Sequence, residues 1–251
     1  MEYICFSDLH ISPTTVEESS FVLRHITEDI LNRFPDVIVC VGDIGTFDSH
    51  NRKSELFGTS ELKEERESII KVLSENFFKP LSDYNDSRRA MKKKLYRPII
   101  VFMLGNHDKL EYKWFQGFFE KMSERIKNCI YLFNNKDIFS SEGVSFSHTF
   151  DKGISGIAHT TCAGMLKDFH ISCIQGHRHV REVAEDRDLE GHKIFGICLP
   201  CATVDRPEWA YSGCSKWDTG WLRLSIKPCK EPHWEFMELP VKMPEEELNY
   251  D

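Results

Sequence analysis

The stretch Pro98-Ile-Ile-Val-Phe-Met-Leu-Gly-Asn-His-Asp108 decides the fold. Its first part, residues 98–104, is a continuous apolar run, which predicts a strand buried on both faces. Its second part is a polar word of four residues: Gly105, Asn106, His107 and Asp108. A given four-residue word occurs by chance in on the order of one in several hundred chains of this length. The stretch therefore indicates a buried strand that delivers chemically active side chains at its carboxyl end.

The same arrangement recurs on both sides of this stretch. Apolar runs at residues 2–6, 37–41, 144–147 and 171–175 predict further strands, and polar clusters follow each of them. In chain order these clusters are Asp8-Leu9-His10, Gly42-Asp43, His148 and Gly176-His177-Arg178-His179. Because ligands in open α/β sheets bind beyond the carboxyl ends of strands, we expect the clusters to converge.

Helical patterns lie between some of these strands. Thr15 and Glu18 fit a capping box that opens a helix to about Phe34, and Pro35 ends it. A strand, a helix and a strand at this spacing predict parallel pairing. A second helix is expected over residues 157–169, and further strands over 194–199 and 221–226.

The residue types of the clusters predict a metal site. Carboxylates, imidazoles and an amide oxygen suit manganese, iron, zinc, nickel or magnesium, and the lack of thiolates argues against a purely structural zinc. The clusters hold more ligands than one ion needs. A carboxylate such as Asp43 can bridge two ions about 3.5–4 Å apart, a spacing that activates water and holds a phosphoryl group. We therefore expect two divalent ions per chain, with manganese favoured, and hydrolysis of a phosphoester.

In this order, the motifs resemble those of the calcineurin-like metallophosphoesterase family, over residues 3 to about 180. Two later stretches, 196–199 and 217–221, are similar to a phage- and prophage-borne branch of that family. The resemblance implies an α/β fold of four layers, an αββα sandwich of two mixed β-sheets flanked by helices. We expect one domain over residues 1–251, with a polar helical insertion at about 46–97 and an acidic tail at about 245–251.

The resemblance also implies a role for each motif residue. The first metal would be bound by Asp8, His10, Asp43 and His179. The second metal would be bound by Asp43, Asn106, His148 and His177. His107 would not be a ligand; it would stabilise the transition state or protonate the leaving oxygen, oriented by Asp108. A hydroxide that bridges the metals would attack phosphorus.

Two positions are open to other interpretations. The fourth motif needs one histidine, and His148, His159 and His170 all lie in the interval. His148 is favoured because it follows a strand, whereas His159 is expected on a helix with a partly exposed ring. Arg178 lies between two predicted ligands and would either touch substrate phosphate or act as a solvent-facing spacer.

Three substrate classes compete. A small phosphomonoester or phosphodiester, such as a nucleotide, is favoured over nucleic acid, the substrate of the family's repair nucleases. A phosphoprotein ranks last, because Gly42-Asp43 is not followed by the Val-Asp-Arg-Gly of the family's protein phosphatases. An inactive metal-binding scaffold would have lost ligands, and every motif ligand is present.

Composition sets the remaining expectations. The net charge is −8, which disfavours binding to a long polyanion, although a basic cluster gathers at Arg88, Arg89, Lys92, Lys93, Lys94 and Arg97. No apolar run is long enough for a membrane span, and the first residues lack the features of a secretory signal. The nine cysteines show no disulfide framework, so we expect reduced thiols and a cytoplasmic location.

Overall fold

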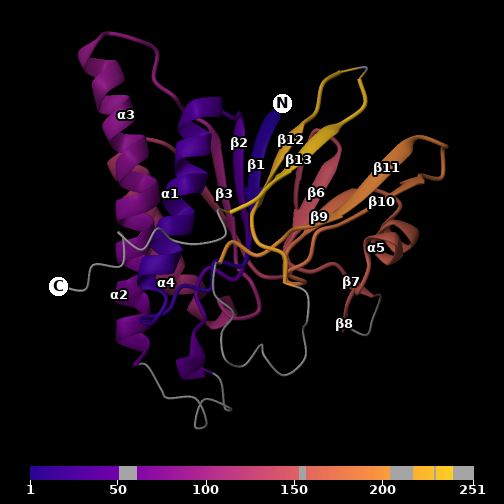
Figure 1. Ribbon diagram of the computed structural model, residues 1–251, viewed down its shortest axis with the longest axis horizontal. Helices are drawn as coiled ribbons and strands as arrows, with labels where there is room; N and C mark the ends of the chain where they lie inside the picture. The colour runs from indigo at the N-terminus through magenta and orange to yellow at the C-terminus, as the bar shows by residue number, and fades with distance from the viewer. Residues whose placement is uncertain (51–60, 153–156, 204–216, 229, 240–251) are drawn as a thin grey trace.

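The apolar runs become the central strands of one mixed sheet. The computed structural model describes residues 1–50, 61–152, 157–203, 217–228 and 230–239. In the first sheet the strand order is β13-β12-β1-β2-β3-β4 (Figure 1). Strands β1 to β4 are parallel to one another, β12 is antiparallel to β1, and β13 is antiparallel to β12. Its strands are β1 (Glu2–Phe6), β2 (Val37–Val41), β3 (Ile99–Met103), β4 (Ile130–Phe133), β12 (Trp221–Ser225) and β13 (His233–Met237).

A second mixed sheet has the order β10-β11-β9-β6-β5. Its central strands β11, β9 and β6 are parallel, and the outer strands β10 and β5 are antiparallel to their neighbours. The bounds are β5 (Phe139–Ser141), β6 (Val144–Ser147), β9 (Ser172–Gln175), β10 (Glu182–Arg187) and β11 (Lys193–Cys198). A small hairpin of β7 (Asp151–Lys152) and β8 (Ile157–Ala158) lies beside it.

Helices cover the outer face of each sheet. The first sheet is covered by α1 (Val16–Arg33), α2 (Leu62–Leu73), the π-helical turn η3 (Ser74–Phe78), α3 (Lys79–Ala90) and α4 (Tyr112–Ile126). The second sheet is covered by α5 (Cys162–Phe169), on the far side of the molecule (Figure 1). Short 3-10 turns are η1 (Asp48–His50) and η4 (Lys109–Glu111). Helices, sheet, sheet and helix make the predicted αββα sandwich, so the fold class is confirmed.

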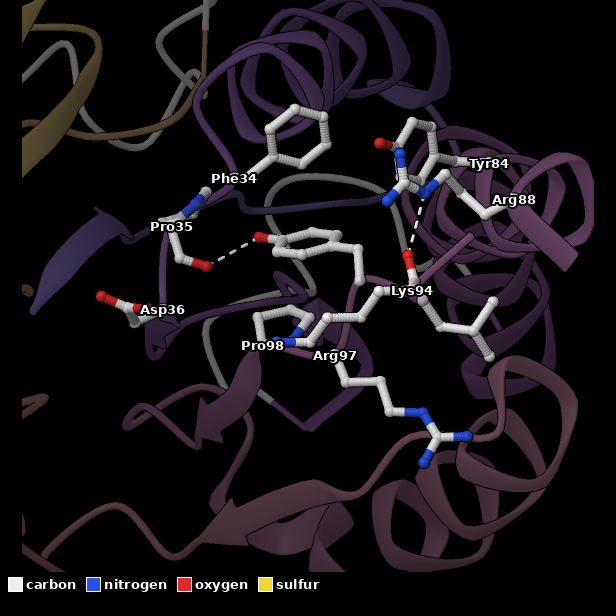
Figure 2. Close-up of a pocket in the computed structure, with 10 residues that line it drawn as sticks. Phe34, Pro35, Asp36, Tyr84, Arg88, Lys94, Arg97 and Pro98 are labelled. Carbon is white, nitrogen blue, oxygen red and sulfur yellow. Dashed lines mark hydrogen bonds between the residues drawn. The ribbon is translucent and has the colours of Figure 1, made fainter. Parts of the chain in front are cut away.

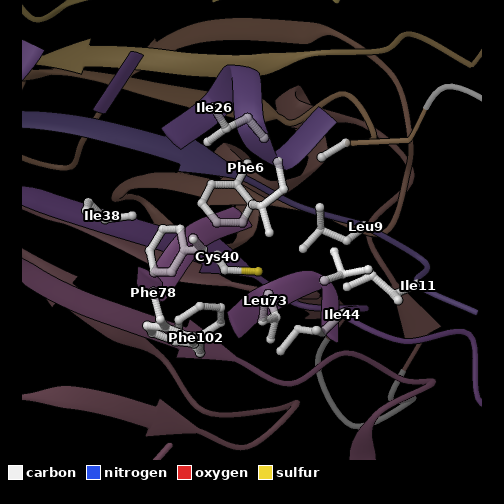
Figure 3. Close-up of a cluster of buried hydrophobic side chains, with 14 of the residues drawn as sticks. Phe6, Leu9, Ile11, Ile26, Ile38, Cys40, Ile44, Leu73, Phe78 and Phe102 are labelled. Carbon is white, nitrogen blue, oxygen red and sulfur yellow. The ribbon is translucent and has the colours of Figure 1, made fainter. Parts of the chain in front are cut away.

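Strands of the first sheet bury both faces, which explains their unbroken apolar sequences. In β1, Tyr3 and Cys5 pack against the second sheet, whereas Phe6 packs against the helices. Figure 3 shows this helix-facing layer, where Phe6 and Phe102 of the strands meet side chains of α1, α2 and η3. Side chains from both sheets fill the layer between them.

Two helix starts differ from the prediction. Thr15 is the N-cap of α1, but its side chain does not cap the helix; its Oγ1 accepts a hydrogen bond from the N–H of Ser12, at 2.9 Å. The capping box is therefore absent. The expected helix over 157–169 begins only at Cys162, where the Thr161 side chain accepts from Gly164 N, because the preceding residues pair as β8.

The segment 46–97 holds α2, η3 and α3, which pack on α1 and bury Ile69, Leu73, Phe77 and Phe78. The predicted acidic tail at 245–251 lies outside the described residues. Within the part of the chain that the structure describes, no helix is long and apolar enough to cross a bilayer.

Candidate metal centre

The predicted site residues follow the carboxyl ends of strands in both sheets. Loops after β1, β2 and β3 come from the first sheet, and loops after β6 and β9 come from the second. Because the sheets pack face to face, these ends meet at one edge of the sandwich. The structure brings together Asp8, His10, Asp43, Asn106, His107, His148, His177 and His179.

Asp8, His10 and His179 form one ligand group. Their ligand atoms all lie within 4.8 Å of one another, and all three residues are buried. Nε2 of His179 is 3.0 Å from Oδ1 of Asp8 and 3.2 Å from Nε2 of His10. Two imidazole nitrogens and one carboxylate oxygen thus point to a common place, as a transition-metal ion requires.

Asp43, His148 and His177 form a second group that meets the same 4.8 Å limit. Nε2 of His148 lies 3.2 Å from Oδ2 of Asp43 and 3.0 Å from Oδ1 of Asn106. Asp43 also falls within 4.8 Å of ligand atoms of His10 and His107. This carboxylate therefore lies between the two groups, where it could bridge two ions.

The protonation of these side chains suits a cation. Burial raises the pKa of the Asp43 carboxyl. His148, together with other nearby histidines, has a larger opposite effect, so the pKa of Asp43 is well below its ordinary value. Burial likewise raises the pKa of Asp8, but the charge and hydrogen bond of His179 contribute most to lowering it, and the pKa is below its ordinary value. Burial lowers the pKa of His10 to about 3. Ionised carboxylates beside a neutral imidazole are the donor set that binds divalent metals.

His148 behaves differently from His10. Burial lowers its pKa, but the carboxylates of Asp43 and Asp8 outweigh burial and raise the pKa to about 10. The protonated ring neutralises part of the charge on Asp43. A divalent cation would compete for the same carboxylate, so its binding at this group would be coupled to release of the His148 proton.

The backbone at the site is strained. Left-handed φ angles occur at Asp8 (58°), His10 (47°), Asp43 (49°), His177 (65°) and His179 (56°). Such angles cost non-glycine residues on the order of 1 kcal/mol each and concentrate at functional sites. Hydrogen bonds between neighbouring loops hold the conformation, for example from Asp8 N to the carbonyl of Gly42 at 2.9 Å.

Two motif glycines are needed because the loops approach the ligands closely. A Cβ at Gly105 would lie 1.9 Å from Oδ1 of Asp43 and 2.3 Å from its backbone nitrogen. Gly42 has a φ of +93°, and a Cβ there would lie 2.3 Å from Nδ1 of His148. The glycines therefore serve the packing of the ligands rather than the chemistry itself.

Backbone groups orient several ligands. Nδ1 of His148 donates to the carbonyl of Val41 at 2.8 Å, which directs Nε2 toward Asp43. The Asp8 carboxylate accepts from the N–H of His177 at 3.0 Å, and the Asp43 carboxylate accepts from the N–H of His107 at 3.0 Å. Each carboxylate thus ties its own loop to the loop of another motif.

A family model described as calcineurin-like phosphoesterase matches residues 1–202. The chain belongs to this family. It is accordingly a metal-dependent phosphoesterase of the dinuclear type, which confirms the predicted enzyme class.

Solved structures give more distant matches to this phosphoesterase. One is a dimetal phosphatase from Danio rerio, with 11% identity and a TM-score of 0.40, covering 91% of this chain and 93% of that chain. A second structure has 10% identity and a TM-score of 0.41, covering 94% of this chain and 98% of that chain. A comparison with curated proteins finds no match.

His107 of this phosphoesterase is only half-buried, unlike His10, whose ring it meets edge-on at a centroid distance of 5.2 Å. Its Nδ1 lies 2.7 Å from the carbonyl of Thr46, which takes the orienting place expected for Asp108. The Asp108 carboxylate accepts backbone N–H groups at 2.9–3.0 Å, from Ile44, Gly45 and Gly105. Asp108 therefore joins the loop after β2 to the loop after β3.

The rival histidines lie elsewhere. His159 precedes α5 rather than lying on a helix, and it is 2% exposed, so the expected partly exposed helical position is wrong. Its Nε2 lies 3.2 Å from Oδ2 of Asp168, and its ring packs on Phe169. His170 is the C-cap of α5. These contacts leave His148 as the histidine that joins the cluster.

Arg178 is half-buried, and its backbone N–H donates to the carbonyl of Gly176 at 2.7 Å. Its Nη1 atom is buried and has no hydrogen-bond partner among the described residues. The pKa of the Cys198 thiol is lowered, chiefly by a hydrogen bond from Cys162 and more weakly by the charge of Arg178.

Trp217 also lies at the site. Its ring meets the His179 ring edge-on at a centroid distance of 4.0 Å and stacks near His10 at 6.4 Å. The next residue, Asp218, donates its N–H to the carbonyl of His179 at 2.9 Å. The run Trp217-Asp218-Thr219-Gly220 was the available signal, but it contains no set of metal ligands.

Proposed function

We propose that this phosphoesterase hydrolyses small phosphate monoesters or diesters, such as nucleotides, with two bound divalent ions. One ion is assigned to Asp8, His10, Asp43 and His179. The other is assigned to Asp43, Asn106, His148 and His177. The observation that carries the assignment is the presence of two ligand groups on either side of Asp43, each within 4.8 Å and buried except for the half-buried His177.

When bound, the ions supply an activated water or hydroxide for in-line attack and neutralise charge that builds on the phosphoryl oxygens. Manganese is the favoured metal. The residues named above would hold the ions, and Asp43 would contribute to both. Asn106 offers a neutral oxygen, which limits the negative charge of the site before substrate phosphate enters.

His107 is assigned to the leaving group. Its half-exposed ring borders the ligand cluster, and its Nδ1 donates to the Thr46 carbonyl at 2.7 Å. This bond fixes the ring and assigns proton exchange with the leaving oxygen to Nε2. Asp108 acts as a positioning residue for both loops. Arg178 is assigned to substrate phosphate, with its half-buried side chain between His177 and His179 in the sequence.

The position of the basic cluster supports a small substrate. The cluster lies at the end of α3 and in the turn before β3, whereas the metal ligands follow the other end of β3. Nucleic-acid binding draws most of its strength from cations along successive phosphates. This cluster is at the wrong edge of the sheet to supply them to the metal centre.

The test is a hydrolysis screen of p-nitrophenyl phosphate, bis-p-nitrophenyl phosphate, nucleotides and DNA with added manganese. We expect turnover of small esters that Asp43→Asn abolishes. The triple reversal of Lys92, Lys93 and Lys94 to glutamate should leave this turnover within about threefold, since surface charges distant from a site act weakly. DNA cleavage that falls steeply with salt and is lost in the triple variant would make the protein a nuclease instead.

A cytoplasmic location is also proposed. The cysteines of the described residues are free thiols, and most of them are buried. Such usage is typical of a reducing compartment.

A further inference from the structure

A hollow at the edge of the sandwich opposite the metal ligands has the lining of a ligand pocket (Figure 2). It has a volume of about 700 Å³, within the usual range for small-molecule sites. Asp36 and Pro98, which line it, immediately precede β2 and β3. The metal ligands follow those strands, and a strand of this length spans roughly 17 Å. The hollow is therefore a separate place from the metal centre.

Aromatic rings form one wall of the hollow. The Phe34 ring lies 5.3 Å from the centroids of both Tyr84 and Tyr96. Tyr96 is held in place, because its hydroxyl donates to the carbonyl of Pro35 at 2.9 Å and its N–H donates to Oδ1 of Asn85 at 2.8 Å. Figure 2 shows Phe34 and Tyr84 bordering the same space, which Tyr96 also lines. A fixed aromatic wall offers a stacking surface for a planar ring.

Phe34 ends α1 as its C-cap, and its N–H donates to the carbonyl of Ile30 at 2.8 Å. Its backbone has φ 52° and ψ 56°, a left-handed conformation that glycine usually fills. A non-glycine residue loses about 1–2 kcal/mol there. The ring is still 43% exposed, so burial offsets little of that loss. The Phe34 side chain therefore adds accessible apolar surface to the hollow.

Cations surround this wall. Arg88, Lys94 and Arg97 line the hollow, against the single carboxylate of Asp36. The Arg88 guanidinium lies 5.9 Å from the centroid of Tyr84, and its Nε donates to the carbonyl of Lys94 at 2.9 Å. Within the described parts of the chain, no carboxylate lies at ion-pair distance from Lys94 or Arg97. The hollow is thus locally positive on a protein with a net charge of −8.

We propose that this hollow binds a mononucleotide. The base stacks on the aromatic wall of Phe34, Tyr84 and Tyr96, and the phosphate pairs with Arg97 and Lys94. The ligand has the same chemistry as the favoured substrate, but at this distance from the metal ligands it is not hydrolysed. The site goes beyond the proposed hydrolysis and does not depend on it.

Calorimetric titration of the full chain with AMP in EDTA tests the proposal, because without metals neither turnover nor phosphate binding by bound ions contributes. We expect one saturable site. Adenosine, ribose 5-phosphate and inorganic phosphate should each bind at least about tenfold more weakly, since each lacks one of the two recognised parts. Equal binding of AMP and inorganic phosphate would overturn the role of the aromatic wall.

Charge reversal inside and outside the hollow gives the matched control. Lys94→Glu and Arg97→Glu should each lower the affinity for AMP at least about tenfold, the scale of one lost charge-assisted contact. Tyr84→Ala should lower the affinity for AMP but not the affinity for inorganic phosphate. Lys92→Glu and Lys93→Glu alter the same cluster at exposed positions outside the lining and should stay within about threefold. Absence of saturable AMP binding would refute the pocket. Equal losses of AMP affinity from charge reversals inside and outside the lining would also refute it.

Discussion

The imidazole Nε2 of His148 lies 3.2 Å from Oδ2 of Asp43, although the two residues follow strands of different sheets. Asp43 follows β2 of the first sheet, and His148 follows β6 of the second. The carbonyl of Val41, at the end of β2, holds the other nitrogen of the same ring. The second ligand group therefore exists only while the two sheets are packed against each other.

His148→Ala should abolish hydrolysis and weaken one of the two metals, because it removes an imidazole from the group around Asp43. Loss of a residue that only hydrogen-bonds to a metal ligand typically lowers metal affinity or activity about 10–100-fold. Loss of a ligand itself should therefore lower activity at least about 100-fold. The matched control is His159→Ala, a buried histidine beside α5, which should keep both metals. Activity lost in His159→Ala but retained in His148→Ala would mean that the fourth motif had been assigned to the wrong histidine.

His107→Ala should separate proton transfer from metal binding. The ring contacts the Thr46 carbonyl at the border of the cluster, so its removal should leave both metals bound. The turnover number should fall about 10²–10⁴-fold, the usual contribution of a general acid. Metal analysis and kinetics on the same preparation check this, with an activated ester such as p-nitrophenyl phosphate as a less affected substrate. An emptied metal site in this variant would show that His107 is a ligand.

Gly105→Ala should damage the centre through sterics alone. The new Cβ would come within 1.9 Å of Oδ1 of Asp43, so the loop or the carboxylate must move. We expect a loss of about 1–3 kcal/mol in the free energy of unfolding, as for other overpacked positions, together with weaker metal binding.

Gly117→Ala is the control for that substitution. Gly117 lies within α4, and a Cβ there meets nothing within 4 Å. Alanine should raise stability by up to about 1 kcal/mol, because glycine is a poor helix former. Thermal unfolding of the two variants should therefore shift in opposite directions; parallel shifts would contradict the close approach at Gly105.

The sequence predicted the central strands and the convergence of the candidate ligands, for a physical reason. β1, β2 and β3 are buried on both faces, so their sequences are unbroken apolar runs, and the candidate metal-binding side chains follow them directly. The edge strand β10 has no such pattern, because it pairs only with β11 and exposes most of its charged side chains.

Other features lacked a usable signal. The helix α4 buries Phe115, Phe118 and Phe119 at helical spacing, but aromatic residues favour strands equally well, and no helix was predicted there. The contact from His107 to the Thr46 carbonyl involves a backbone group, which any residue would supply. The packing of Trp217 on His179 depends on how distant loops meet, and no local pattern encodes it.

Metal stoichiometry tests the central claim most directly. The protein should be stripped with chelator, reconstituted with manganese, and analysed for bound metal and for ester hydrolysis beside Asp43→Asn. We expect two ions per chain in the unchanged protein, fewer in Asp43→Asn, and activity that rises as the second ion binds. At most one ion in the unchanged protein, with the same content in Asp43→Asn, would contradict it.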